Sequence, residues 1–490
     1  MKDTYRLILA LIVTAYVLLG GLYAALTPAW QVPDEPAHYN YVRAIAEEGA
    51  FPVMERGDYD PAYLEQLTSQ QFPADMPIDA ITYEDHQPPL YYLLAAPVYI
   101  LFDGALLPLR LVSVAVGAAL LVIVYGLTRS LFPAQPFLAI AAAALVAFLP
   151  QHIAMTAGVE NDALAELWIG AALWMAVRYV QRKSGGRQFL VGWGLTLGLG
   201  MLTKVSTYVV LPVSLLAIWL RARREEGGRS LGQSLRAAAP RWAWMMLAVV
   251  LLTAPWFARS ISLYGWSDPI GQARHNSVVV GQLTTVDALA QYGWGWLLGR
   301  FAHFTFQSFW GQFGWMGVPL QPAIYGVLAI LSLLLLAGAA GWLFDRCRPR
   351  LAAAQRDGLI LLATSAVLTL LLYLAYNVTF VQHQGRYLFP ALIPLAVSAA
   401  LGIDWLLAPR TARRAAAALA ALGIGMAAWG VARGDLPVLP IRSALGAALL
   451  LGVAAYFPRW GRGLALAALA TALVALDLYA LFGAIIPALT

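Results

Sequence analysis

Residues 7–26 read LILALIVTAYVLLGGLYAAL, a run that contains no charged side chain. Such a run is long enough to cross the hydrocarbon core of a membrane as an α-helix. Comparable runs recur along the 490 residues, of which 60% are hydrophobic and 12% charged, and the mean hydropathy is +0.68. Soluble domains do not have this composition, and a membrane β-barrel would alternate apolar and polar residues. The sequence therefore predicts an all-α polytopic membrane protein.

The apolar runs predict thirteen membrane-spanning helices. We place them at residues 5–27, 106–127, 136–151, 161–180, 188–202, 205–220, 242–262, 322–344, 358–377, 387–408, 413–431, 441–457 and 463–487. The first run is too long for a cleaved signal sequence and is followed by further spans, so we expect it to remain as a helix.

Charge predicts the orientation of these spans. With the N-terminus inside, 22 of the 32 Lys and Arg residues fall in or beside the inner loops, including 182–187, 221–241, 346–356, 410–414 and 459–462. Twelve acidic residues lie between Asp34 and Asp85, in an outer segment. This is the positive-inside distribution, so we expect an external C-terminus. The net charge of +6 arises from these loops and does not indicate nucleic-acid binding, and Cys347, as the single cysteine, excludes an internal disulfide.

Two predicted external segments, about 28–89 and 263–321, are too long to be simple connectors, and long ordered loops tend to be functional. We expect them to carry short interfacial helices. The second is dense in aromatic side chains: Trp294, Trp296, Phe301, Phe304, Phe306, Phe309, Trp310, Phe313 and Trp315. These rings fit an interfacial belt, a wall for a lipid tail or sugar, or both.

Asp34 and Glu35 stand side by side after the first span, in Val32-Pro33-Asp34-Glu35-Pro36-Ala37-His38-Tyr39. Acids beside a membrane are costly to bury and are usually functional. Asp34 also fits the position that caps a helix beginning at Glu35. Other polar residues fall at the outer ends of the predicted spans, at one depth: His86, Gln151, His152, Glu160, Asn161, Asp162, Lys204, Arg259, Gln382, His383, Gln384 and Arg386.

A carboxylate beside several cations suits one kind of chemistry at a membrane surface. The carboxylate can deprotonate an incoming hydroxyl, and Arg and Lys can hold a phosphate leaving group. A phosphate at the interface with an apolar tail in the membrane describes a polyprenyl-phosphate sugar. The sequence contains no glycine-rich phosphate loop for a nucleotide sugar, so we expect a lipid-linked donor.

The arrangement resembles the GT-C superfamily of integral membrane glycosyltransferases, including protein O-mannosyltransferases and the aminoarabinose transferases of lipid A. The resemblance covers about residues 1–390. The motifs that carry it are Pro33-Asp34-Glu35-Pro36, Gln87-Pro88-Pro89-Leu90-Tyr91-Tyr92, Glu160-Asn161-Asp162, Thr203-Lys204 and Gln384-Gly385-Arg386-Tyr387-Leu388-Phe389-Pro390. Many relatives have a Lys where this chain has Gln87, and some have a cation where it has Ala37; His38 and His86 lie beside those positions.

The resemblance implies roles for these residues. Asp34 would be the catalytic base, with Glu35 as its neighbour. Candidates for binding the donor phosphate are Lys204, Arg386, His86, His38 and Arg259. Candidates for the acceptor side, or for a second acid, are Asp162, Glu160, Asn161, Tyr91, Gln384 and His383. Some members of the superfamily use a metal, so a divalent cation, Mg or Mn, on Asp34, Glu35 and Asp162 is a further option.

We therefore expect an inverting glycosyltransferase of the cytoplasmic membrane that moves a sugar from a polyprenyl-phosphate donor to an acceptor hydroxyl on a glycan, lipid or protein, with its site on the external face. Residues 1–390 would form the catalytic domain, and 391–490 helices for packing or lipid contact. The alternatives are a glycan ligase or polymerase with a polyprenyl-pyrophosphate donor, a lipid-glycan transporter or flippase, and a non-catalytic assembly subunit.

Overall fold

The computed structural model describes residues 2–183, 185–227, 230–345 and 351–490. Outside these ranges lie five residues of the predicted inner loops: Arg229, Arg346, Cys347, Arg348 and Arg350.

Most of the described residues lie in helices. Its first half holds α1 (Lys2–Leu26), α2 (Glu35–Arg43), the π-helix η1 (Ala44–Glu48), α3 (Pro61–Ser69), α4 (Leu90–Leu101), α5 (Leu106–Leu131), α6 (Pro136–Ala147), α7 (Pro150–Thr156), α8 (Asp162–Val180), α9 (Arg187–Met201), the 3-10 helix η2 (Val205–Val209), α10 (Val210–Glu225) and α11 (Leu231–Tyr264). The second half holds α12 (Gln272–Val278), α13 (Thr285–Trp310), β1 (Gln312–Phe313), β2 (Val318–Pro319), α14 (Pro322–Phe344), α15 (Ala353–Thr379), the 3-10 helix η3 (Gly385–Ala391), α16 (Leu392–Leu406), α17 (Pro409–Arg433), α18 (Val438–Tyr456), α19 (Pro458–Tyr479), the π-helix η4 (Ala480–Ile485) and α20 (Ile486–Leu489).

The all-α membrane fold is confirmed, whereas the count of thirteen spans is not. Eleven helices within the described ranges are long and apolar enough to cross a membrane, and α6 with α7, bent by 64°, makes a twelfth if the pair is one span. The predicted span at 188–202 is helix α9, whose 15 residues fall short of the roughly 20 that a straight span needs.

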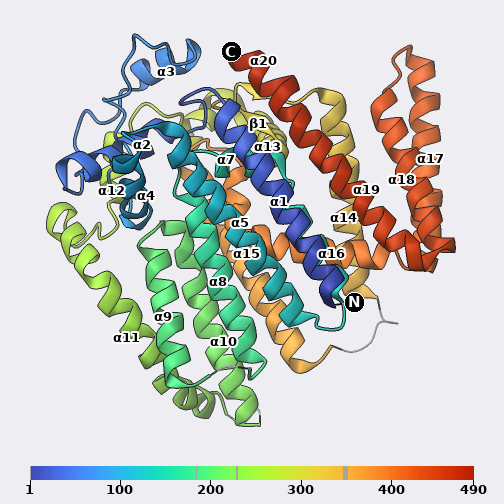
Figure 1. Ribbon diagram of the computed structural model, residues 1–490, viewed down its shortest axis with the longest axis horizontal. Coiled ribbons are helices and arrows are strands. Elements are labelled where there is room, and N and C mark those ends of the chain that lie inside the picture. The colour runs from blue at the N-terminus through green and yellow to red at the C-terminus, as the bar shows by residue number, and fades with distance from the viewer. Residues whose placement is uncertain (1, 184, 228–229, 346–350) are drawn as a thin grey trace.

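The two long segments fold over one end of the helix bundle (Figure 1). The first contains α2, η1 and α3, and the second contains α12, α13 and the antiparallel β1–β2 pair, in which Gln312 faces Pro319. Helix α13 is interrupted at Gly293, whose positive φ of 76° breaks it into two parts. These elements, with α4 and α7, surround the polar residues that the sequence singles out.

Small residues let several helices approach closely, as is common where helices pack within a membrane. A Cβ on Gly194 of α9 would stand 2.2 Å from the Met245 carbonyl oxygen of α11. A Cβ on Gly338 of α14 would stand 2.7 Å from the Gly402 carbonyl oxygen of α16.

The last helices contact the polar end of the bundle. The Tyr23 hydroxyl of α1 donates to the Asp477 carbonyl oxygen of α19 at 2.7 Å, and the Gln71 amide donates to the Ala488 carbonyl oxygen of α20 at 2.8 Å. The predicted division at residue 390 stays a prediction.

Candidate active site

Asp34 lies in the tight turn between α1 and α2. Its φ of 69° is left-handed, a conformation that Asp adopts more readily than most residues. Helix α2 begins at Glu35 with Pro36 in its first turn, and Asp34 occupies the N-cap position, but the Asp34 side chain makes no capping hydrogen bond. The alternative that Asp34 serves only as a helix cap is therefore wrong. The strained turn instead directs the carboxylate into a cavity.

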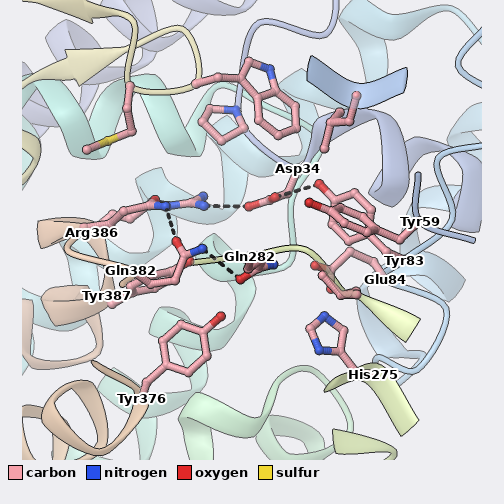
Figure 2. Close-up of a pocket in the computed structure, with 16 residues that line it drawn as sticks. Asp34, Tyr59, Tyr83, Glu84, His275, Gln282, Tyr376, Gln382, Arg386 and Tyr387 are labelled. Atoms are coloured by element: carbon pink, nitrogen blue, oxygen red, sulfur yellow. Dashed lines mark hydrogen bonds and ion pairs between the residues drawn. The ribbon is translucent and has the colours of Figure 1, made fainter. Parts of the chain in front are cut away.

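The Asp34 carboxylate pairs with Arg386 of η3 (Figure 2). Arg386 Nη2 lies 2.6 Å from Asp34 Oδ2, and the Tyr83 hydroxyl donates to Asp34 Oδ1 at 2.8 Å. Arg386 is further oriented by Nε, which donates to Gln384 Oε1 at 2.7 Å. Burial favours the neutral carboxyl, but the Arg386 charge and the hydrogen bonds from Arg386 and Tyr83 outweigh it and hold the pKa of Asp34 below its usual value.

Glu35 pairs with a different cation from Asp34, and its predicted catalytic role is wrong because its carboxylate is buried in a structural ion pair. Its side chain is fully buried, and its two oxygens accept hydrogen bonds from Arg110 Nε at 2.7 Å and Nη2 at 2.6 Å. Arg110 also donates to three carbonyl groups at the end of α1: Ala24, Thr27 and Pro28. Glu35 therefore ties α2 to α1 and α5, and its oxygens are not available to a substrate.

A second charged group forms around Lys204, between α9 and η2. Lys204 Nζ lies 2.6 Å from Asp162 Oδ1 and 3.4 Å from Glu160 Oε1. Burial disfavours the ammonium, but the two carboxylates hold the pKa of Lys204 above its usual value. Glu160 Oε1 is also 3.9 Å from Arg386 Nη1, so Glu160 stands between the two cations. The structure thus brings Lys204 and Arg386, both candidates for binding the donor phosphate, to the same carboxyl group.

The two tyrosines of the Pro-Pro-Leu-Tyr-Tyr motif form hydrogen bonds with residues next to the Lys204 group. The Tyr92 hydroxyl lies 2.8 Å from His38 Nδ1, and Asn161 Nδ2 donates to it at 3.4 Å. The Tyr91 hydroxyl accepts from the Glu160 backbone N–H at 3.1 Å. Burial, and then the Lys204 charge, lower the pKa of His38 to about 3, so His38 is neutral and does not add a cation to the site.

A cavity of about 260 Å³ opens beside Asp34 (Figure 2). Its lining is mostly aromatic, amide and acidic: Asp34, Tyr59, Tyr83, Glu84, His275, Gln282, Trp315, Tyr376, Gln382, Gln384, Arg386 and Tyr387, with Pro33, Leu64, Val279 and Met316. Trp315 and Met316 enter it from the turn between β1 and β2, where both have left-handed backbone.

Of the predicted phosphate-binding and acceptor residues, Arg386 and Gln384 line this cavity, and three others belong neither to the cavity lining nor to the group around Lys204. Arg259 donates to the carbonyl oxygens of Phe51 and Pro52, at 2.9 and 2.8 Å, and thereby ties α11 to the first long segment. The His86 ring packs 4.6 Å from the His275 ring, and the His383 ring packs edge-on against Phe301. Their predicted roles are corrected to structural ones.

Sequence reasoning also missed residues that the structure places at or behind the cavity. Arg110, which fixes Glu35, is a lone cation in an apolar run, and that pattern alone marks a position of interest. Tyr83 and Glu84 stand in the acidic first segment but were not assigned a role. Gln382 was noted among the polar residues at the outer ends of the spans but was not assigned a role, and Gln282 carries no sequence signal, because amides are common in loops.

The residues do not fit the divalent cation that the resemblance suggested. Within the described ranges, no group of three or more His, Cys, Asp or Glu side chains is arranged to hold a metal ion. Asp34, Glu35 and Asp162 pair instead with three different cations, Arg386, Arg110 and Lys204. A dependence on Mg or Mn stays an untested prediction.

The chain is similar to one family model and to several solved structures. The family model described as dolichyl-phosphate-mannose-protein mannosyltransferase matches residues 86–258. ArnT from Cupriavidus metallidurans bound to undecaprenyl phosphate matches with a TM-score of 0.52 at 14% identity, covering 97% of this chain and 77% of that one. Its apo state matches with a TM-score of 0.53 at 15% identity, covering 98% and 77%. The chain therefore has an ArnT-like GT-C fold, the fold that the sequence resemblance implied.

A weaker likeness, with a TM-score of 0.47 at 15% identity, links the chain to the archaeal oligosaccharyltransferase AglB from Archaeoglobus fulgidus in complex with an inhibitory peptide and a dolichol-phosphate. That match covers 96% of this chain and 56% of AglB. A search of curated protein sequences finds no significant match.

Proposed function

We propose that this protein is an inverting glycosyltransferase that moves a sugar from a polyprenyl-phosphate donor to an acceptor hydroxyl. The observation that carries the proposal is the ion pair of Asp34 with Arg386 in a polar cavity at one end of a membrane bundle. The ArnT structure with this fold holds undecaprenyl phosphate, which supports a lipid-linked donor.

The reaction follows from the two partners of that ion pair. Asp34 accepts the proton of the acceptor hydroxyl, and the acceptor oxygen forms a bond to the anomeric carbon from the side opposite the phosphate. The bond from the anomeric carbon to the phosphate oxygen breaks, and its electron pair leaves with the polyprenyl phosphate. Arg386 and Lys204 stabilise that departing anion. Attack from the opposite side inverts the anomeric configuration.

Donor binding also prepares the base. Arg386 is engaged with Asp34 in the free protein, so a phosphate that takes Arg386 weakens the pair. Asp34 then becomes a stronger base at the moment when the donor is in place. Glu160, whose pKa is raised by burial and by the nearby Asp162 carboxylate, adds little negative charge against the phosphate when it is neutral.

We place the site on the external face of the cytoplasmic membrane. The end of the bundle opposite the cavity carries cationic loops, which the positive-inside rule assigns to the cytoplasm. Described residues of this kind are Arg129, Arg182, Lys183, Arg221, Arg223, Arg224, Arg236, Arg241 and Arg414.

The test uses the purified full chain and a panel of radiolabelled undecaprenyl-phosphate monosaccharides. Wild type is compared with Asp34→Asn and with Asp75→Asn, an exposed acid of the same segment. We expect transfer by wild type and Asp75→Asn, and a loss of about a hundredfold or more in Asp34→Asn. Equal transfer in all three would remove Asp34 as the base, and transfer only from pyrophosphate-linked donors would favour a ligase or polymerase.

A further inference from the structure

The cavity contains a second carboxyl group that the proposed reaction does not use. This group is Glu84, which follows Tyr83, the residue whose hydroxyl donates a hydrogen bond to Asp34. The Glu84 side chain lines the same cavity as Asp34 (Figure 2). Gln87 Nε2 donates to Glu84 Oε2 at 2.8 Å. Among the bonds of the described residues, Oε1 is therefore the oxygen left for a ligand.

The surroundings of Glu84 separate its chemistry from that of Asp34. Burial, and then the Asp34 carboxylate, raise the pKa of Glu84 to about 7, whereas the pKa of Asp34 is lowered. Charged or titratable groups reach Glu84 from several elements: Asp34 before α2, Asp162 at the start of α8, Lys204 after α9, and across the cavity His275 of α12 and Arg386 of η3. Two carboxyls whose environments drive their pKa values apart divide the roles of base and hydrogen-bond donor between them.

The opposite wall is a chain of amides. Arg386 Nε donates to Gln384 Oε1 at 2.7 Å, Gln384 Nε2 donates to Gln382 Oε1 at 2.9 Å, and Gln382 Nε2 donates to Gln282 Oε1 at 3.0 Å. Each amide carries both donors and acceptors, which suits a ligand with many hydroxyl groups.

The charge of the cavity selects against anionic ligands. Arg386 is the only cation among the described residues that line it, and its Nη2 is already paired with Asp34. Burial lowers the pKa of His275, which also lines the cavity, so this ring is neutral. A ligand carrying a second phosphate or a carboxylate would bury that charge beside two acids without a partner, which is costly. The rings of Tyr59, Tyr83 and Trp315 offer flat faces to an uncharged ring.

We propose that Glu84 is a second substrate-binding residue of this cavity, where its carboxylic acid donates a hydrogen bond to a ring hydroxyl of an uncharged saccharide. The saccharide is a reactant only if the proposed transfer is correct, but its binding is measurable without turnover. Its source is either the sugar of the donor or a saccharide acceptor, because both present the same hydroxyls.

The experiment measures binding of methyl α-D-mannopyranoside, methyl α-D-glucopyranoside, methyl β-D-glucuronide and mannose 6-phosphate to the purified full chain by saturation-transfer NMR. It compares wild type, Glu84→Gln, Glu84→Ala and Glu65→Gln, an exposed acid of α3. Titrations are run at about pH 5.5 and about pH 8.5, on either side of the raised pKa of Glu84. Thermal unfolding of each variant establishes that it is folded.

We expect wild type and Glu65→Gln to bind a neutral glycoside about tenfold more weakly at the higher pH, because ionised Glu84 cannot donate. Glu84→Gln keeps a donor at both pH values and loses this dependence, while Glu84→Ala binds weakly at both. The glucuronide and the phosphate bind more weakly than the neutral glycosides. An unchanged pH dependence in Glu84→Gln, tighter binding of the anionic sugars, or no binding of any glycoside would each overturn the proposal.

A further arm identifies the source of the saccharide. Undecaprenyl-phosphate mannose is added to the glycoside complex, with undecaprenyl phosphate as the control. Displacement of the glycoside by the mannose-bearing lipid alone assigns the Glu84 contact to the donor sugar, and persistence in both assigns it to the acceptor. Because Asp34→Asn is expected to keep glycoside binding but lose transfer, failure of the proposed reaction and failure of the Glu84 site give different results.

Discussion

Asp34 Oδ2 and Arg386 Nη2 lie 2.6 Å apart although 352 residues separate them in the chain. The turn after the first helix supplies the carboxylate, and the 3-10 helix η3 supplies the guanidinium. The side chain of Arg386 is 6% exposed and that of Asp34 is 23% exposed, so the pair stands at the edge of the cavity with the acid toward its opening.

Arg386→Gln should shift the acid limb of kcat/KM to higher pH. Arg386 lowers the pKa of Asp34, and the base must be ionised, so losing the cation raises the pH at which activity appears. We expect a shift of about 1–3 pH units. The measurement is transfer as a function of pH, with Arg414→Gln, exposed at the opposite end, as control. A limb that stays in place would mean that Arg386 does not set the ionisation of Asp34.

Lys204→Gln should mainly weaken binding of the donor. The ammonium, 2.6 Å from Asp162 and 3.4 Å from Glu160, is the second cation near the pair, and its loss leaves two acids facing the phosphate. We expect the donor KM to rise about tenfold or more, with a smaller change in kcat. Lys183→Gln, at an exposed position of the opposite end, should leave the donor KM unchanged. If only the acceptor KM rises, Lys204 belongs to the acceptor side.

Glu35→Gln should destabilise the protein more than Asp34→Asn does, because both side chains of the Glu35 pair are buried whereas Asp34 is 23% exposed. Glu35 neutralises Arg110 in a buried pair, and removing one partner of such a pair leaves an uncompensated buried charge. The expected loss in the free energy of unfolding is about 3–5 kcal/mol. Thermal unfolding of both variants in the same detergent provides the comparison. Equal loss in the two variants would contradict the different roles given to these adjacent acids.

Gly385→Ala should impair the site through its backbone. A Cβ on Gly385 would stand 2.3 Å from the Thr305 carbonyl oxygen and 2.4 Å from the Phe309 backbone nitrogen of α13, so η3 must move. That movement displaces Arg386, the next residue. We expect a loss of about 1–3 kcal/mol in stability together with weaker donor binding.

The matched control for this change is Gly425→Ala in α17, where an added Cβ meets no atom within 4 Å. Replacing Gly by Ala inside a helix is itself favourable, so this variant should keep both stability and transfer. Normal donor binding by Gly385→Ala would show that the contact between η3 and α13 does not position Arg386.

The helices were predictable because burying backbone in lipid leaves few alternatives. Long apolar runs mark helices whether or not their neighbours are known, and each predicted span corresponds to a helix or to the bent pair α6–α7. Helix α9 shows the limit of this reasoning. An apolar run defines a helix, but its length in the fold depends on where packing against α8 and α11 ends it.

Candidate site residues were predictable by type and depth but not by direction. Lys204 and Arg386 were expected to act with Asp34; Arg386 pairs with Asp34 directly, and Lys204 is linked to Arg386 through Glu160. Arg259 has the same charge at a similar depth, yet it bonds to the carbonyl oxygens of Phe51 and Pro52. Which cation faces the cavity depends on contacts between segments more than two hundred residues apart.

The sequence alone determined that this is an all-helical membrane protein with acids and cations gathered at one end, because hydropathy and charge are local properties of the chain. Only the tertiary structure distinguished the surroundings of Asp34 from those of Glu35. The left-handed turn at Asp34 sends two adjacent carboxylates in opposite directions, one to Arg386 in the cavity and the other to Arg110 in the core. The tertiary structure also placed Glu84 beside Asp34, where burial and then the Asp34 charge raise the pKa of Glu84 while Arg386 holds the pKa of Asp34 down.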